Sequence, residues 1–542
     1  MPKAVKTQKS VPPRTVTELL SERSLSEILS SRQTEEIVIG VCGPLGSGAD
    51  RVAKLFKEKL EHVYRYTTDY IKLSGVIAQC YASLTNNKKL LTEINSYPEA
   101  RRIEKLQDLG NELRSIFGND ILSQFSVEHI AVNRQEHLKK LKKPKEELIS
   151  RRFATIIDSL KHPDEYALLS RVYGKMFYLV GVLCPEQTRE GRLTKKPRGL
   201  SKEDAVRLIE RDRGEAVEYG QQLLKTIQHS DFFVSNVTEN VEQIPNTVNR
   251  FLDLMFNKKI HTPTVHEYAM HAAHSAAMRS GCMSRQVGAA IVNECGDIIA
   301  TGRNDVPRCG GGLYTEGALG IDSRCLREAG GKQCRSDLFK RDILDKISEI
   351  IKKHMQTRGE ICVGEIDSLF NRIQSMPELR GLIEFSRSVH AEMDAITTIA
   401  RNGYSSLKNA TLYCTTFPCH HCARHIVAAG IKKVYYVEPY EKSLAISLHD
   451  DSMVTDVQDD ESVAGNGLPP KVKILPFEGV APKQFINLFA VSDRKKDGSL
   501  AQPDVQLAKP VVEKFMDTYK EYEEKVTIYL REKLSSTTLP KK

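Results

Sequence analysis

Two short motifs in the second half of the chain carry residues that bind zinc in other proteins. His390 and Glu392 form an H-x-E motif, and Cys419 and Cys422 form a P-C-x-x-C motif downstream. One imidazole and two thiolates leave the fourth position of a tetrahedral zinc ion to water, which is typical of a catalytic site. Because ligands far apart in the sequence must meet at one ion, the two helices predicted to begin near these motifs must converge at their N-termini.

The alternative for these motifs is a structural zinc site with a fourth protein ligand from His420, His421 or His425. Glu392 argues against it, because a structural site has no use for a carboxylate two residues after a ligand. The combined pattern is instead typical of zinc deaminases that act on cytosine. There Glu392 would accept a proton from an activated water, pass one to ring nitrogen N3 and later protonate the departing ammonia.

Residues 264–480 resemble the deoxycytidylate deaminase branch of the cytidine deaminase superfamily. The segments that carry this resemblance are 284–292, 299–307, 390–396, 417–423 and 429–434. The resemblance implies an enzyme that hydrolyses the amino group of a deoxycytidine nucleotide, with zinc and the catalytic glutamate at the two motifs above. It also implies that Arg285 and Asn304 contact the nucleotide, although both residues also suit a turn with no role in binding.

The sequence departs from that family in a long insert between Pro307 and His390. The insert carries four cysteines, Cys309, Cys325, Cys334 and Cys362. Some members of the family hold a second, structural zinc near the positions of Cys282 and Cys309, so the resemblance raises the expectation of a second metal. The irregular spacing of the insert cysteines does not select its ligands.

The first half opens with a predicted strand, a glycine-rich loop and a helix. An apolar run at 36–42 indicates a buried strand, and apolar positions at helical spacing predict a helix over 49–62. Loops in this setting hold nucleotide phosphates with backbone amides. The loop residues expected to contact a nucleotide are Gly43, Gly46, Ser47 and Gly48. Ala49 and Asp50 replace the lysine and the serine or threonine of a working loop, so efficient phosphotransfer is not expected.

The first half resembles a nucleoside or nucleotide kinase whose phosphate loop has degenerated. Residues 182–192 resemble the segment that leads into the lid of such a kinase. Further buried strands are predicted at 177–183 and 231–236, which favours a doubly wound parallel sheet. Two interpretations stay open at this point, a purely structural descendant of a kinase and a sensor that binds a nucleotide.

The predicted fold is α/β throughout, and a chain of 542 residues favours more than one domain. Four parts are predicted: a flexible lead at 1–35, the kinase-like parallel sheet at 36–258, a deaminase-like α/β/α domain at 264–508, and a C-terminal helix at 509–542.

A degenerate kinase-like domain ahead of a deoxycytidylate deaminase resembles the bacterial anti-phage deaminases, which deplete the deoxycytidine nucleotide pool during infection. This resemblance implies action on both dCMP and dCTP. It also implies control by a regulatory RNA or another cellular signal, and assembly into a homo-oligomer.

The composition of the chain restricts where the protein can be located and which partners it can bind. A net charge of +9 suits phosphate-bearing ligands but is too dilute over this length for a surface that coats nucleic acid. Residues 1–24 lack the apolar core of a secretory signal, and no stretch reaches the ~18 apolar residues of a membrane span. We therefore expect a cytoplasmic protein with no membrane partner, whose 12 cysteines stay reduced.

A polynucleotide cytidine deaminase, acting on RNA or single-stranded DNA, is the alternative function. Such an enzyme needs a basic channel with aromatic side chains to hold a flipped base. The chain has no tryptophan, and its densest basic run, at 139–145, lies in the first half and is followed by Glu146 and Glu147. That run is either a solvated helix end or a contact for a regulatory RNA.

Overall fold

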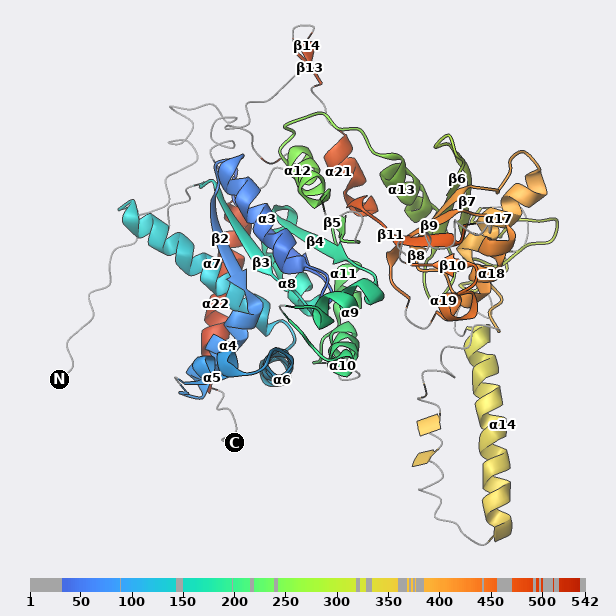
Figure 1. The fold of residues 1–542 in the computed structure, drawn as a ribbon, viewed down its shortest axis with the longest axis horizontal. Helices are drawn as coiled ribbons and strands as arrows, with labels where there is room; N and C mark the ends of the chain where they lie inside the picture. The colour runs from blue at the N-terminus through green and yellow to red at the C-terminus, as the bar shows by residue number, and fades with distance from the viewer. Residues whose placement is uncertain are drawn as a thin grey trace.

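The computed structural model is an α/β structure built on two six-stranded sheets, which lie side by side in Figure 1. It describes residues 32–87, 89–142, 150–196, 198–214, 219–237, 242–317, 322–327, 334–358, 368–369, 372–373, 376, 385–440, 443–455, 470–490, 494–496, 499–500, 510 and 516–536. No helix within these ranges has both the length and the apolar composition that a membrane span requires.

The first sheet has the strand order β12-β5-β4-β1-β3-β2. Its central strand β1 (Ile37–Cys42) is buried along its whole length and pairs in parallel with β3 (Phe153–Asp158) and β4 (Phe177–Leu183). Strands β2 (Thr67–Lys72) and β5 (Phe232–Ser235) extend the parallel arrangement on either side. A parallel strand that is covered on both faces can be apolar throughout, which explains the continuous runs in β1 and β4.

Helices pack against both faces of this sheet. The helices of the first half are α3 (Ala49–His62), α4 (Leu73–Leu84), α5 (Leu90–Ser96), α6 (Glu99–Phe117), α7 (Ile121–Lys140), α8 (Pro163–Tyr173), the 3-10 turn η1 (Gly174–Met176), α9 (Glu186–Thr194), α10 (Lys202–Arg213), α11 (Leu223–Ile227) and α12 (Ile244–Met255). One core joins α3 and α12 to the sheet, and a second core joins α4, α6, α7 and α8 to the opposite face.

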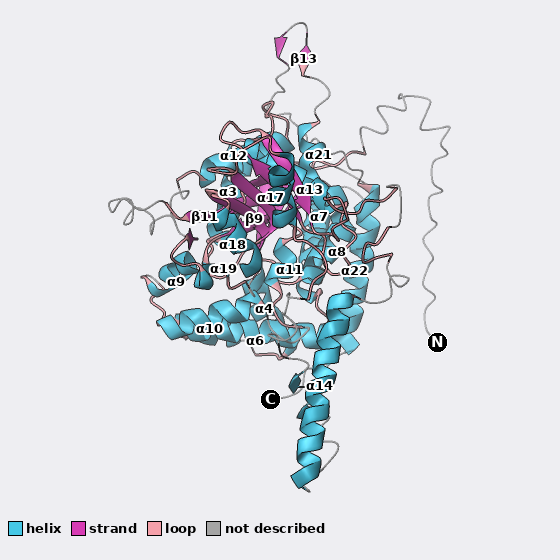
Figure 2. Cartoon of the chain, turned by 90° about the vertical axis from the view of Figure 1, so that its right-hand side faces the viewer, coloured by secondary structure: helices cyan, strands magenta, loops and turns pink. Residues whose placement is uncertain are grey.

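The second sheet has the order β10-β11-β9-β8-β6-β7. Its strands are β6 (Gly288–Val292), β7 (Ile298–Arg303), β8 (Thr411–Thr416), β9 (Lys433–Glu438), β10 (Met453–Val454) and β11 (Val472–Pro476). Strand β6 is antiparallel to β7 and β8, and the strands from β8 to β10 run parallel. Its helices are α13 (Val265–Ala277), α17 (Ala391–Asn402), α18 (His420–Ala428) and α19 (Ala445–Leu448). Helix α14 (Arg335–Arg358) extends away from the body in Figures 1 and 2.

A segment after the second sheet returns to the first one. Strand β12 (Gly479–Val480) pairs antiparallel with β5 and forms the edge of the first sheet. The carboxylate of Glu478 accepts hydrogen bonds from the Ser235 N–H, at 3.1 Å, and from the Thr247 hydroxyl, at 2.8 Å. The 3-10 turn η5 (Pro482–Gln484) and helix α21 (Phe485–Phe489) follow, and α21 contacts α12.

The C-terminal helix α22 (Asp517–Ser536) also packs on the first half, against α7 and α8. Arg134 of α7 forms ion pairs with Glu36, at 2.6 Å, and with Glu523 of α22. The strands β13 (Lys495–Lys496) and β14 (Ser499–Leu500) form a separate hairpin. The domain limits drawn from the sequence stay predictions, but the segments from β12 to α21 and α22 contact the first half.

We expect Glu267→Ala to lower the free energy of unfolding by roughly 2–4 kcal/mol, because Glu267 ties the start of α13 to strand β12. Its buried carboxylate accepts from the Thr264 and Val480 amides, at 2.8 and 3.0 Å, and pairs with Arg250 at 2.6 Å. Urea unfolding measures the change, with exposed Glu294→Ala as the matched control. Equal stability of the two variants would contradict this role for Glu267.

Candidate active site

Three side chains converge where two helices of the second half begin. His390 is the N-cap residue of α17, and Cys419 is the N-cap residue of α18. The His390 Nδ1 atom lies 3.3 Å from the Cys419 sulfur and 3.4 Å from the Cys422 sulfur. A tetrahedral zinc ion with bonds of about 2.1 Å to nitrogen and 2.3 Å to sulfur separates such atoms by about 3.6 Å. The donor set and its spacing therefore fit zinc.

The glycine at 302 explains how α17 comes so close to the sheet. A Cβ atom at Gly302 of β7 would overlap the backbone carbonyl oxygen of Ala391, in the first turn of α17. Only a residue without a side chain lets this helix begin directly against the strand. The approach brings His390 and Glu392 to the edge of the sheet that also carries the Cys419 loop.

The neighbouring histidines do not join the cluster. Among the described residues, His390, Cys419 and Cys422 form the only group of three or more potential ligands whose donor atoms come within 4.8 Å of one another. His421 instead contacts Arg424 of the same helix, with 3.0 Å between the two nitrogens. Three protein ligands leave one tetrahedral position for a ligand from outside the protein, which is the arrangement of catalytic zinc sites.

The hydrogen bonds within the cluster favour the deprotonated form of one of its two thiols. A hydrogen bond from Cys422, and then one with His390, lower the pKa of Cys419 to about 4 despite burial. The reciprocal hydrogen bond with Cys419, together with burial, raises the pKa of the Cys422 thiol. The two thiols thus share one proton most easily, and a cation is needed to hold both as thiolates.

Glu392 lies in the first turn of α17 and is 4% exposed. Burial, followed by the negative charge of Cys419, raises its pKa above the ordinary value. The thiol of Cys414, on β8, also hydrogen-bonds to this carboxylate. A raised pKa moves a carboxyl group toward the range in which it both takes up and releases a proton, as a general acid and base must.

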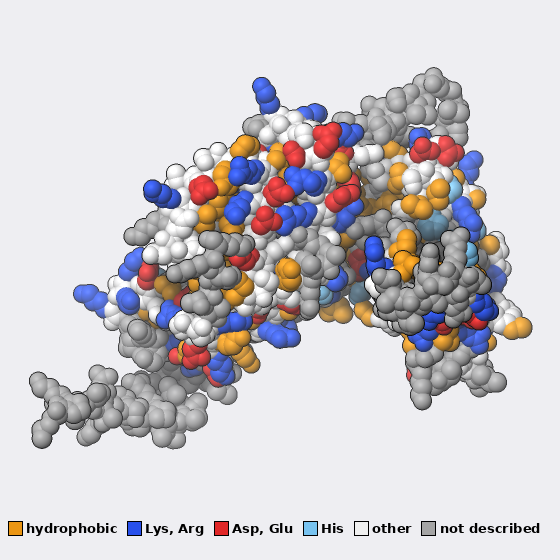
Figure 3. Space-filling model, turned by 90° about the horizontal axis from the view of Figure 1, so that it is seen from below, with side chains coloured by type: hydrophobic (Ala, Val, Ile, Leu, Met, Phe, Trp, Pro, Cys, Tyr) orange, Lys and Arg blue, Asp and Glu red, His pale blue; other side chains and the backbone are white. Residues whose placement is uncertain are grey.

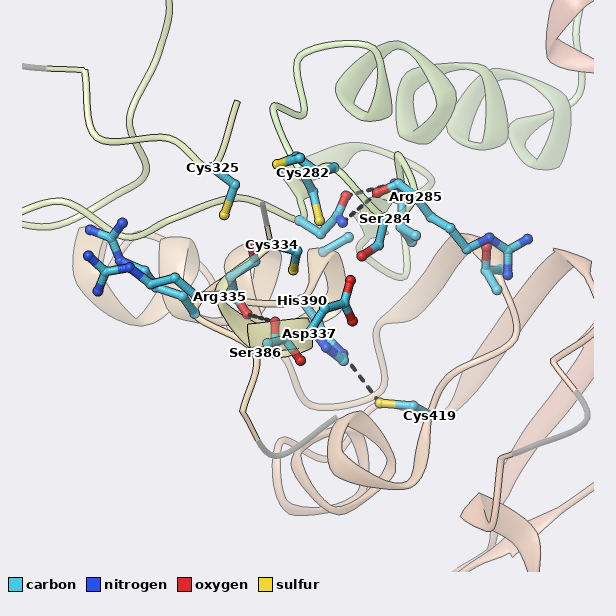
Figure 4. A pocket seen from close by; sticks show the side chains of 18 of the residues that line it. Cys282, Ser284, Arg285, Cys325, Cys334, Arg335, Asp337, Ser386, His390 and Cys419 are labelled. Carbon is cyan, nitrogen blue, oxygen red and sulfur yellow. Dashed lines mark hydrogen bonds between the residues drawn. The ribbon is translucent and has the colours of Figure 1, made fainter. Parts of the chain in front are cut away.

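His390, Glu392 and Cys419 line a cavity of about 410 Å³, which Figure 4 shows from close by. Phe417 and Tyr440 contribute aromatic surface to its wall. Four basic residues also line it, namely Arg285, Arg335, Lys340 and Arg387. The side chains of Arg285 and Arg335 lie on opposite sides of the cavity in Figure 4. The cavity therefore combines a metal-ligand cluster, a buried acid, aromatic surface and positive charge.

The two residues that the sequence assigns to the substrate both line this cavity. The Asn304 Oδ1 atom accepts from the Val287 N–H, and its Nδ2 atom donates to the Arg285 carbonyl oxygen, each at 2.7 Å. One N–H and one oxygen lone pair of the amide remain for other partners. The Arg285 side chain is 50% exposed and pairs with Glu438 at the end of β9. Their contact with substrate stays a prediction.

The cysteines considered for a second metal are distributed unevenly. Cys282, Cys325 and Cys334 line the same cavity, whereas Cys309 is exposed and does not. Figure 4 shows these three on the side of the cavity opposite Cys419. They do not come together as closely as the His390 cluster does. Cys362 lies outside the described residues.

The predicted phosphate-loop residues lie in the first half, away from this cavity. Gly46 and Gly48 have φ angles of 82° and 83°, and the loop joins β1 to α3 as predicted. Gly43, Gly46 and Gly48 line a separate cavity of about 220 Å³, and Ser47 is fully buried beside them.

The family described as the cytidine and deoxycytidylate deaminase zinc-binding region matches residues 263–438. The deoxycytidylate deaminase of Enterobacteria phage T2 is 30% identical over 178 residues, 32% of this chain and 80% of the relative. That of Enterobacteria phage T4 is 31% identical over 177 residues, 32% of this chain and 78% of the relative. The chain belongs to the deoxycytidylate deaminase family.

A solved dCMP deaminase from the cyanophage S-TIM5, in complex with dCMP and dUMP, is 22% identical and covers 35% of this chain and 93% of its own, with a TM-score of 0.21. The part of this chain that matches the family, residues 263–438, contains the whole His390 cluster and Glu392. It also spans the insert that supplies Arg335, Lys340 and Arg387. These three basic residues could not be identified from the sequence, because no local motif shows that the insert folds back onto the cavity.

Proposed function

We propose that this member of the deoxycytidylate deaminase family hydrolyses the 4-amino group of dCMP and dCTP, yielding the deoxyuridine nucleotide and ammonia. The observation that carries the proposal is the convergence of His390, Cys419 and Cys422 with buried Glu392 in one cavity. The matched family and the names of the phage relatives point to the same substrate class.

The chemistry divides between a bound zinc ion and the side chains around it. When bound, zinc is a Lewis acid that lowers the pKa of a water molecule at its open position. Glu392 would take a proton from water, protonate N3 of the cytosine ring as the bond to C4 forms, and later protonate the leaving amine. Phe417 and Tyr440 would pack against the ring and exclude bulk water.

The rim of the cavity suits the phosphate of the substrate. Arg285, Arg335, Lys340 and Arg387 place four basic side chains along its lining. Guanidinium groups bind phosphate oxygens with charge-assisted hydrogen bonds. Because the rim carries several such groups rather than one, a triphosphate and a monophosphate can both be accommodated, which fits the proposed use of dCTP as well as dCMP.

The proposal is tested by incubating the protein with dCMP, dCTP, CTP and a cytosine-bearing oligonucleotide, and separating the products by chromatography. We expect conversion of dCMP and dCTP, with CTP slower by roughly 10-fold to 100-fold because its ribose carries an additional hydroxyl. Conversion of the oligonucleotide alone would replace this proposal with the alternative, a polynucleotide cytidine deaminase.

That alternative needs a continuous basic channel for a nucleic-acid strand. On the face that Figure 3 shows, blue basic and red acidic side chains are interspersed over the first half instead of forming one basic track. Of the basic run at 139–145, the described residues Lys139, Lys140 and Lys142 are exposed near the end of α7. A contact between this run and a regulatory RNA stays a prediction, which gel shifts at several salt concentrations would test.

We expect Arg285→Gln to raise KM for dCMP about 10-fold and to leave kcat nearly unchanged, because a phosphate contact contributes equally to the ground and transition states. Steady-state kinetics with dCMP and with deoxycytidine separate this role from a structural one, since deoxycytidine has no phosphate to lose. Arg327→Gln is the matched control, because Arg327 is 53% exposed, pairs with Glu316 and does not line the cavity. An equal loss with both substrates would make Arg285 a structural residue.

Several wider properties extend this proposal. We propose depletion of the deoxycytidine nucleotide pool in anti-phage defence, a homo-oligomeric assembly and a cytoplasmic location, on the strength of the resemblance of the two fused halves to anti-phage deaminases. A second zinc, bound by Cys282 with cysteines of the insert, also stays a prediction. Metal analysis before and after Cys325→Ser would detect it as the loss of one zinc ion with His390, Cys419 and Cys422 intact.

A further inference from the structure

The first half contains a second cavity, of about 220 Å³, beside the glycine-rich loop. It lies beyond the carboxyl ends of β1 and β3, which is where parallel α/β sheets bind ligands. Its walls include the loop glycines, basic Lys72, Arg102 and Arg198, and apolar Ile77 and Leu106. The family match begins only at residue 263, so this cavity is not part of the deaminase site.

The backbone of the loop is already in contact with an acid of the same chain. The Leu45 N–H donates a hydrogen bond to Asp212 Oδ2, at 2.6 Å. Asp212 lies in the last turn of α10 and is only 2% exposed. A carboxylate oxygen thus takes a backbone donor of the kind that phosphate loops present to a phosphate.

A lysine from another strand completes this arrangement. Lys161 follows β3, and its Nζ atom lies 2.7 Å from Asp212 Oδ1 and 2.8 Å from the Gly43 carbonyl oxygen. The loop itself has Ala49 where a lysine would stand, so Lys161 brings the missing positive charge to the loop from elsewhere. The two oxygens of Asp212 are divided between an amide and an ammonium group, which is how a phosphate would be held.

The loop also holds a polar group without a partner. The Ser47 hydroxyl is fully buried, and it makes no hydrogen bond within the described residues. A buried hydroxyl in this state costs free energy unless a ligand or water satisfies it. Ser47 itself is not among the residues that line the cavity.

The helix that carries Asp212 is attached to the loop through a small core of its own. Leu193, Leu208 and Ile209 of α9 and α10 form that core, and Leu45 of the loop packs against it. The core is separate from the two that hold the sheet. Helix α10 also contacts α6 and α11, so this core and those contacts together hold Asp212 beside the loop.

We propose that the Asp212 carboxylate is an internal occupant of the anion site formed by the loop and Lys161, and that a nucleoside phosphate binds by displacing it. Asp212 and the ligand phosphate compete for the Leu45 N–H and the Lys161 ammonium. The ligand body would lie against Ile77 and Leu106. The loop is then a gated binding site rather than a relic, and this inference does not rest on the deaminase activity.

The test compares the binding of inorganic pyrophosphate by calorimetry, at fixed ionic strength, to the full-length protein and its variants. Asp212→Ala should bind about 10-fold more tightly than the unaltered chain, because the competing state is removed. Adding Lys161→Met to Asp212→Ala should abolish that gain. Glu210→Ala is the matched control, since Glu210 is an exposed acid of the same helix, and it should change nothing.

A second variant covers the case in which Asp212→Ala fails to fold. Asp212→Asn keeps the size and a hydrogen-bond acceptor but removes the charge, so it should show the same gain in smaller measure. Equal pyrophosphate affinity in folded Asp212→Asn, Glu210→Ala and the unaltered chain would overturn the proposal. So would a gain that survives the addition of Lys161→Met, because the site would then lie elsewhere.

Discussion

Replacement of Glu392 with glutamine is expected to lower kcat for dCMP by about 10³-fold to 10⁴-fold while the zinc content stays at its original value. Glutamine has nearly the same shape but cannot carry a proton between water, the ring nitrogen and the leaving amine. The three metal ligands are untouched, so binding of the ion should not change. Loss of activity without loss of metal is what distinguishes a proton carrier from a residue that supports the site.

Metal analysis and product formation measured on the same preparation decide this prediction. Asp394→Asn is the matched control, because Asp394 is a buried acid in the same first turn of α17 that does not line the cavity. It accepts a hydrogen bond from the Arg303 N–H, which asparagine can preserve. Appreciable turnover by Glu392→Gln would remove Glu392 from the reaction, and loss of zinc would make it a structural residue.

Removal of one thiolate is expected to remove both metal and activity. In Cys419→Ala or Cys422→Ala, two protein ligands remain, and metal affinity falls steeply because binding energy depends on the full donor set. We expect one zinc ion fewer per chain and no measurable deamination. Because a bound ion would tie the start of α17 to the start of α18 through His390 and both thiols, a lower melting temperature should accompany the loss.

His421→Ala provides the comparison for the cysteine variants. His421 lies between the two cysteines in sequence, yet its imidazole contacts Arg424 and is not part of the metal-ligand cluster. It should keep its zinc and most of its activity. If His421→Ala lost zinc and Cys419→Ala kept it, His421 would replace Cys419 among the three assigned ligands.

Segments whose environment is uniform were predictable from the sequence. The helix predicted over 49–62 and the strand over 177–183 match α3 and β4 to the residue. The strand β4 is buried along its length, so its apolar run is unbroken. Strand β2 is the outer strand of the sheet with mixed exposure, and its sequence TTDYIK has no such run. It was missed because an edge strand does not require apolar residues on both faces.

The two candidate sites also differ in how far the sequence alone predicts their residues. His390, Glu392, Cys419 and Cys422 were found because each pair is separated by a fixed short spacing at the start of a helix. Lys161 and Asp212 could not be identified from the sequence, although they contact the glycine-rich loop that the sequence does indicate. They reach it from the end of β3 and from α10, and only the folding of the sheet brings those elements together.

The return of β12 to the first sheet has a consequence for how the protein is made. Strand β5 ends at Ser235, and its edge partner begins at Gly479. At about 5 to 20 residues per second, synthesis of that partner follows by roughly 12 to 50 seconds. During this time the newborn first half presents an open strand edge, a feature that invites pairing with other chains. A chain that stops before residue 479 lacks β12, so the edge of β5 stays open even when every other strand of the first sheet is present.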